Sequence, residues 1–201
     1  MRERQLAWMD RYIALGVPVE QAYVMTAFGC NFGGEVPVSA ITDQIRWLVD
    51  ACVDRRIPLP AVYLADTMGW ANPNEIRRRI GAVREIVPKA QIGLHLHDTR
   101  GAGGANVYGA LQMGVRRFDS SVAGLGGCPF AGHKEGGAAG NICTEDMVFM
   151  CHELGIETGI DLDALIDAAR LAERIIGRTL SGHVMHSGSL TGLRKPAAKF
   201  A

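Results

Sequence analysis

The sequence of 201 residues lacks several features that would mark a membrane protein, a secreted protein or a nucleic-acid-binding protein. It contains no apolar run approaching the roughly 18 residues of a membrane-spanning helix, and its first eight residues, Met-Arg-Glu-Arg-Gln-Leu-Ala-Trp, do not form the apolar stretch of a signal peptide. Its 21 basic residues balance 21 acidic ones, so no charge excess favours nucleic acid or a membrane surface. We therefore expect neither as a partner.

Cysteine pairing motifs and nucleotide-binding motifs are also missing. The five cysteines are an odd number, and none stands in a Cys-x-x-Cys or zinc-ribbon spacing. Such thiols suit a reducing compartment, so we expect a cytoplasmic protein. No Gly-x-Gly-x-x-Gly or Walker loop follows a candidate strand, which leaves nucleotide binding without support.

The sequence does contain a regular alternation of short apolar runs and helical patterns. Four runs, at residues 22–28, 61–65, 91–97 and 116–123, are predicted as strands. Apolar residues at helical spacing follow each of them, and the segment Asn72-Pro73-Asn-Glu75 supplies an N-cap, a first-turn proline and an acidic residue at N3. This alternation predicts right-handed βαβ units and a parallel sheet.

Two parallel architectures fit the alternation, an open doubly wound sheet and a (β/α)8 barrel, and both place their sites at the carboxyl ends of strands. Only four strands are predicted, whereas a full barrel typically needs about 250 residues. A barrel of this length would be half of one. We expect this α/β domain to cover residues 1–180 and a weakly ordered tail, rich in Gly, Ser and Lys, to cover residues 181–201.

Two histidines stand at the end of the third predicted strand. His95 and His97 are two residues apart, so their side chains leave the same face of the strand. Two neutral imidazoles can bind one divalent cation, and Asp98 is close enough in sequence to help order such a site. The alternative is a pair of core histidines satisfied by hydrogen bonds.

A single cysteine stands in the glycine-rich segment 124–129, Gly-Leu-Gly-Gly-Cys-Pro, after the last strand. A glycine-rich segment allows close backbone approach to a ligand and can move as a lid. The thiol of Cys128 could then act as a nucleophile or a general acid. The alternative, a buried small hydrophobe, better describes Cys52, Cys143 and Cys151.

Three further polar residues are placed near strand ends or helix starts. Asp66 ends the second predicted strand, and Asn141 and Glu145 flank the start of the helix after the cysteine segment. Each alone would be explained as a turn or capping residue. Together with the histidines and the loop thiol, they form the candidate set for one active site.

At these residues the chain resembles the 3-hydroxy-3-methylglutaryl-CoA lyase family, metal-dependent TIM-barrel lyases related to the isopropylmalate and homocitrate synthases. The resemblance extends from about residue 22 to residue 177 and is most specific in segment 121–130, Ser-Val-Ala-Gly-Leu-Gly-Gly-Cys-Pro-Phe. Segments 64–69 (Leu-Ala-Asp-Thr-Met-Gly), 95–99 (His-Leu-His-Asp-Thr) and 140–146 (Gly-Asn-Ile-Cys-Thr-Glu-Asp) also match the family's pattern.

The resemblance implies a fold, a reaction and a set of roles. The chain would hold the last four βα units of the barrel plus C-terminal helices, and would cleave 3-hydroxy-3-methylglutaryl-CoA, or a similar 3-hydroxyacyl-CoA, to acetyl-CoA and acetoacetate. The metal, Mg²⁺ or Mn²⁺, would be bound by His95, His97 and Asn141. Cys128 would be the catalytic thiol, with Asp66 and Glu145 supporting the site.

The chain also departs from the family pattern. The family opens with a strand ending in Arg-Asp, which has no counterpart here, so we expect a homo-oligomer (a dimer) or a complementary amino-terminal half as partner. One alternative is a Claisen-condensing acyl-CoA synthase of the same superfamily, although those relatives typically continue His-Asn-Asp and lack the Gly-Gly-Cys-Pro loop. Another alternative is a non-catalytic fragment that needs the missing half.

Overall fold

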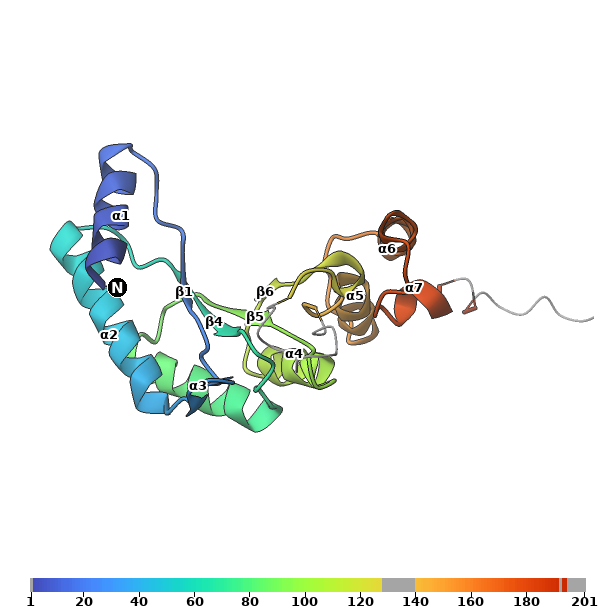
Figure 1. Cartoon of the computed structure of the whole chain (residues 1–201), viewed down its shortest axis with the longest axis horizontal. Coiled ribbons are helices and arrows are strands. Elements are labelled where there is room, and N and C mark those ends of the chain that lie inside the picture. The colour runs from blue at the N-terminus through green and yellow to red at the C-terminus, as the bar shows by residue number, and fades with distance from the viewer. Residues whose placement is uncertain (1, 128–139, 192, 195–201) are drawn as a thin grey trace, which may run out of the picture.

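The computed structural model describes residues 2–127, 140–191 and 193–194. Its centre is a four-stranded sheet whose strands are all parallel (Figure 1). The strand order is β1 (Gln21–Val24), β4 (Ala61–Asp66), β5 (Ile92–Leu96) and β6 (Arg117–Asp119). The sheet is open, with β1 and β6 as its two edges. The four predicted strands are therefore confirmed, and their order follows the chain.

Each connection between neighbouring strands carries a helix, as the βαβ prediction requires. Figure 1 shows these three helices following one another around one side of the strands, while the last helices lie together beyond β6. The helices are α1 (Arg2–Ala14), α2 (Val38–Arg55), α3 (Pro73–Ile86), α4 (Gly103–Gln112), α5 (Thr144–Glu153), α6 (Leu162–Ile176) and α7 (Val184–Ser187). Asn72 caps α3 through its side-chain oxygen, as the sequence predicts, and Asp161 caps α6 in the same way.

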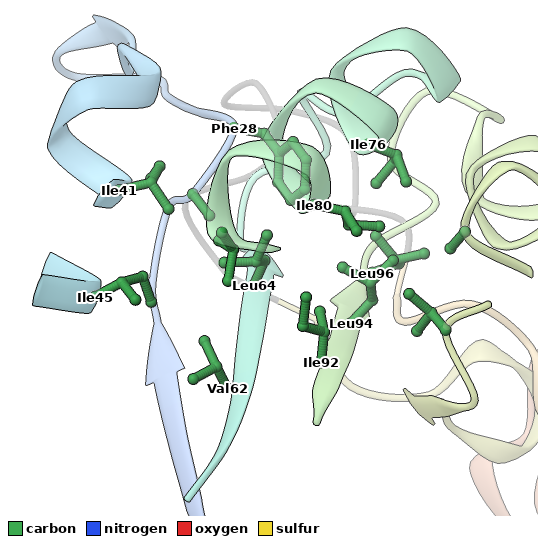
Figure 2. Packing of buried hydrophobic residues seen from close by; sticks show 14 of the residues in the cluster. Phe28, Ile41, Ile45, Val62, Leu64, Ile76, Ile80, Ile92, Leu94 and Leu96 are labelled. Carbon is green, nitrogen blue, oxygen red and sulfur yellow. The ribbon is translucent and has the colours of Figure 1, made fainter. Parts of the chain in front are cut away.

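The main core lies between the sheet and the connecting helices α2, α3 and α4 (Figure 2). Alternate strand residues point into it, and the helices contribute the apolar side chains that recur at helical spacing. Its members include Val62, Leu64, Ile92, Leu94, Leu96, Ile41, Ile45, Ile76 and Ile80, which are all buried. Burial at these alternating positions fixes the register, because a slip by one residue would turn the whole apolar set to the other face.

The opposite face of the sheet carries polar and aromatic side chains. Tyr23, Tyr63, Gly93 and Arg117 are partners in register across the four strands. The rings of Tyr23 and Tyr63 stack with centroids 4.8 Å apart, and Gly93 leaves room for the Tyr63 ring, which a Cβ at this position would strike. The next residues on this face include His95 and Asp119, which are also in register.

The first strand ends earlier than expected, at Val24 instead of Phe28. Thr26 takes a left-handed conformation, with a φ of 50°, and its N–H donates to Thr67 Oγ1 over 2.8 Å. A small antiparallel hairpin, β2 (Gly29–Cys30) with β3 (Gly34–Glu35), then follows. It was not predicted, because strands of two residues are too short to show an apolar alternation.

A buried arginine of α3 binds both ends of the segment from Ala27 to Val36. Arg79 is 2% exposed and donates to the carbonyl oxygens of Ala27 and Val36, both over 2.6 Å. Its guanidinium also pairs with Glu75 and lies 5.3 Å from the centre of the Phe28 ring. This contact holds the hairpin against the carboxyl end of the sheet.

Part of the segment expected to be a tail is packed. Val184 and Met185 of α7 are buried against α5 and α6, and Asp146 accepts hydrogen bonds from the N–H groups of His183 and Val184. A helix of four residues is too short to produce a periodic pattern in the sequence. None of the helices in the described parts of the chain is both long and apolar enough to span a membrane.

Candidate active site

The candidate residues converge at the carboxyl ends of β4, β5 and β6. His95 is in register with Ala65 on one side and Asp119 on the other. His97, just beyond β5, forms an isolated bridge with Asn141. Since the core takes Ile92, Leu94 and Leu96 from β5, the two histidines leave the strand on the face away from the helices.

The two histidine rings lie side by side and are both held through Nδ1. Their centroids are 5.0 Å apart and their planes meet at 84°. His95 Nδ1 lies 3.2 Å from Asp119 Oδ2, and His97 Nδ1 lies 2.9 Å from the carbonyl oxygen of Asp66. Because a carbonyl oxygen can only accept, His97 donates from Nδ1 and carries its lone pair on Nε2.

His97 is also kept in the neutral form that binds metals. It is 5% exposed, and burial lowers its pKa below the ordinary value for histidine, against the opposing effect of its bond to Asp66. A neutral imidazole with Nδ1–H occupied is the ligating state of a histidine.

Asn141 supplies an oxygen acceptor beside this pair. Its amide nitrogen donates to the carbonyl oxygen of Leu125 over 3.1 Å, which fixes the amide orientation. Its Oδ1 is buried and has no hydrogen-bond partner within the described ranges. A buried acceptor without a donor costs free energy unless a ligand satisfies it, so the orphaned oxygen fits a cation.

His95, His97 and Asn141 therefore provide two imidazole nitrogens and one amide oxygen, a donor set that could hold a divalent cation. Within the described residues, no three or more His, Cys, Asp or Glu side chains lie together in a group that could hold a metal ion. Among the described residues, Asn141 is the further acceptor that the bridge to His97 brings beside the two histidines.

Asp66 faces the loop that follows its strand. Its Oδ1 accepts from the N–H of Trp70 over 2.7 Å, and its Oδ2 accepts from the N–H of Ala71 over 3.1 Å. The side chain is 1% exposed, and burial raises the pKa of its carboxyl to about 6, despite the two backbone donors. In this structure Asp66 shapes the β4–α3 loop and contributes its backbone oxygen to His97.

Glu145 is buried beneath the segment that leads to the cysteine. Its Oε2 accepts from the N–H of Ala123 over 3.0 Å, and its Oε1, packed against Gly182, has no hydrogen-bond partner within the described residues. Burial raises its pKa. Ala123 has a φ of 55°, uncommon for a residue with a Cβ, so Glu145 stabilises a strained turn, η1 (Val122–Gly124).

Cys128 and Asp98 are the two remaining residues that the sequence predicts near the site. Cys128, predicted as the catalytic thiol, lies outside the described residues. Asp98 accepts from the N–H of Gly103 over 2.6 Å, so its carboxylate supports the start of α4 beside the histidine pair.

The sequence reasoning did not select Tyr23 and Asp119. Asp119 Oδ2 accepts from the Tyr23 hydroxyl over 2.9 Å and also contacts His95. Burial, followed by the bond to Asp119, raises the pKa of Tyr23 to about 12. The sequence did offer one indication. Asp119 ends β6, and consecutive strands of a parallel sheet are usually neighbours, so β6 could be expected beside the strand that carries the histidines.

Comparison with known proteins places the chain in a family. Residues 10–172 match the HMGL-like family model. Over 160 residues the chain is 39% identical to hydroxymethylglutaryl-CoA lyase YngG of Bacillus subtilis, covering 80% of this chain and 50% of the relative. Over 162 residues it is 40% identical to the (R)-citramalyl-CoA lyase of Chloroflexus aurantiacus, covering 81% of this chain and 48% of the relative.

Solved structures agree. A hydroxymethylglutaryl-CoA lyase from Pseudomonas aeruginosa has a TM-score of 0.79 at 33% identity, over 92% of this chain and 58% of the other. An HMG-CoA lyase from Acinetobacter baumannii, in complex with coenzyme A and 3-methylmalate, has a TM-score of 0.74 at 40% identity, over 88% and 54%. The chain thus spans about half the length of the relatives it matches, and the predicted barrel-type α/β fold is confirmed as an open four-stranded portion. The chain belongs to the HMGL-like family.

Proposed function

We propose that this chain carries the metal-binding part of a carbon–carbon lyase that cleaves 3-hydroxy-3-methylglutaryl-CoA, or a similar 3-hydroxyacyl-CoA, with Mg²⁺ or Mn²⁺. One observation supports this most strongly. Two histidines with occupied Nδ1 atoms and an asparagine with an orphaned buried oxygen meet at the carboxyl ends of parallel strands. Sites of barrel enzymes lie at this end.

The reaction is a retro-aldol type cleavage. The C3 hydroxyl gives its proton to a general base, the C3 oxygen becomes a carbonyl as the C2–C3 bond breaks, and the bonding electron pair passes to the thioester as an acetyl-CoA enolate, which a general acid then protonates. With 3-hydroxy-3-methylglutaryl-CoA the products are acetoacetate and acetyl-CoA. A divalent cation lowers the pKa of a coordinated hydroxyl, which makes the first proton transfer accessible near neutral pH.

The residues of this chain divide the remaining tasks. His95, His97 and Asn141 present their acceptor atoms, and Asp66 orients His97 through its carbonyl oxygen. Glu145 fixes the turn at Ala123, from which the glycine-rich segment continues toward Cys128. We assign the protonation of the enolate to the Cys128 thiol, acting as a general acid.

The acyl group has a second candidate. The chain is 40% identical to the (R)-citramalyl-CoA lyase over 162 residues and 39% identical to the hydroxymethylglutaryl-CoA lyase over 160 residues. Citramalyl-CoA is therefore tested beside 3-hydroxy-3-methylglutaryl-CoA. The relatives reported above are lyases, which favours cleavage over condensation. As partner we propose a second copy or a complementary amino-terminal half, and as location the cytoplasm.

The test is an assay for acetyl-CoA by mass spectrometry with both thioesters, with and without Mn²⁺. The 201-residue chain is assayed alone and mixed with the amino-terminal half of the Bacillus subtilis relative. Metal-dependent acetyl-CoA that is lost in His97→Ala supports the proposal, and His152→Ala, which removes an exposed histidine of α5, is the matched control. No product from a folded chain, either alone or mixed, would contradict the proposal, whereas product only in the mixture would show that the chain is a fragment that needs the amino-terminal half.

A further inference from the structure

The carboxylate of Asp119 connects two elements of the candidate site. One oxygen, Oδ2, lies 2.9 Å from the Tyr23 hydroxyl and 3.2 Å from His95 Nδ1. Asp119 belongs to β6, His95 to β5 and Tyr23 to β1, the far edge of the sheet. A single carboxylate thus receives donors from two other strands.

We propose that Asp119 is a positioning residue, which holds His95 as the Nδ1–H tautomer and so leaves His95 Nε2 free to bind a metal ion. A carboxylate can only accept, so the nitrogen that faces it must carry the proton. The nitrogen that is protonated in a neutral imidazole is set by the hydrogen bond that the ring makes. This inference rests on the metal site of the proposed function, but the tautomer exists without metal.

Tyr23 fixes the carboxylate in turn. Its ring stacks on Tyr63 at 4.8 Å and meets the His95 ring edge-on at 6.4 Å, so its hydroxyl has a defined position. By donating to the same oxygen, it holds Oδ2 where His95 needs an acceptor. Tyr23 therefore supports the tautomer indirectly, and its loss has a smaller effect than the loss of the carboxylate.

The two histidines differ in how they are held, and this difference makes the inference testable. His97 is oriented by a backbone oxygen, that of Asp66, which no side-chain substitution removes. His95 is oriented by a side chain, and Asp119 can be replaced. The effect of replacing Asp119 should therefore be confined to His95, with His97 serving as an internal reference.

The first measurement uses the metal-free chain of 201 residues. Nitrogen NMR of histidine rings at pH 8, where ordinary histidines are neutral, distinguishes the two tautomers, and the signals are assigned by their loss in His95→Gln and His97→Gln. We expect Nδ1–H for both rings in the wild type. An Nε2–H tautomer at His95 would overturn the proposal without any variant.

The second measurement uses substitutions. In Asp119→Ala we expect His95 to lose the fixed Nδ1–H tautomer while His97 keeps it, and Asp119→Asn, which retains an acceptor oxygen, should keep more of it. Tyr23→Phe preserves the ring stack and should shift His95 less than Asp119→Ala does. An unchanged His95 tautomer in a folded Asp119→Ala chain contradicts the proposal. If that variant does not fold, Asp119→Asn and the wild-type tautomer still decide.

The third measurement is Mn²⁺ affinity by calorimetry. Groups that hydrogen-bond a metal-ligating histidine typically change affinity by about 10–100-fold when removed, so we expect the Mn²⁺ dissociation constant to rise by that factor in Asp119→Ala and by less in Tyr23→Phe. Unaltered affinity would show that Asp119 does not position a ligand. If the wild type binds no Mn²⁺ but the tautomers behave as expected, the metal function fails while the role of Asp119 stands.

Discussion

Replacing Asp66 with asparagine should change how the stability of the metal-free chain depends on pH. The carboxyl is 1% exposed, and burial raises its pKa from 3.8 to about 6. The folded chain therefore holds this proton more tightly than the unfolded chain. The contribution of Asp66 to the free energy of unfolding is fully retained below pH 4 and falls as the pH rises toward 6.

The size of this effect follows from the two pKa values. One pKa unit corresponds to about 1.4 kcal/mol, so the ionised carboxyl costs the folded state about 3 kcal/mol above pH 6. Asparagine does not ionise, but it offers one acceptor oxygen to the two N–H groups of Trp70 and Ala71. Leaving one buried donor unpaired costs about 1–3 kcal/mol at every pH.

The assay is urea unfolding of wild type and Asp66→Asn between pH 4 and pH 8 in the presence of a chelator. We expect the variant to be less stable by about 1–3 kcal/mol at pH 4, and the difference to disappear or reverse by pH 7. Asp161→Asn is the control. Asp161 is the N-cap of α6, and aspartate and asparagine cap a helix about equally well. If the free energies of unfolding of wild type and Asp66→Asn change with pH in parallel, the raised pKa of the buried Asp66 carboxyl is refuted.

Three further predictions concern the thiol, the buried arginine and the open edges. Cys128→Ser should sharply reduce turnover in the reconstituted enzyme and leave Mn²⁺ affinity nearly unchanged; equal turnover in a Cys151→Ser control and in Cys128→Ser would remove the assigned role of the thiol. Arg79→Leu should lower the free energy of unfolding by roughly 2–5 kcal/mol, because the carbonyl oxygens of Ala27 and Val36 lose their donor and Glu75 keeps only Arg78 as its ionic partner; urea unfolding would show it, and a loss under 1 kcal/mol would contradict it. The unpaired edges β1 and β6 should make the chain self-associate, which light scattering measures as a mass that rises with concentration; a strict monomer at all concentrations would be evidence against this.

The four strands of the main sheet and the longer helices were predictable because their signals are local. The apolar residues of α2 and α3 recur at helical spacing, and Asn72 and Asp161 mark two helix starts by capping chemistry. Boundaries were less predictable where the backbone leaves regular geometry. The left-handed Thr26 ends β1 early, and the strained Ala123 replaces the end of the predicted fourth strand with a turn.

The candidate site was predictable only in part. His95 and His97 could be placed together from their spacing, since side chains two apart share a strand face. The partnership of Asp119 with Tyr23 and His95 could not, because it depends on strand register across the sheet. Burial likewise decides what Asp66 and Glu145 contact, and the sequence shows only that carboxylates stand near these strand ends.

The most direct test of the central claim is a Mn²⁺ titration followed through the histidine ring signals of the 201-residue chain. Bound Mn²⁺ broadens the signals of nearby nuclei, so the account predicts that His95 and His97 broaden first, while His152 and His183 stay sharp. In Asn141→Ala the same broadening should require more Mn²⁺, because the orphaned oxygen is gone. Broadening that is uniform, or that starts at His183 beside Asp146, would contradict a metal site at the carboxyl ends of the strands.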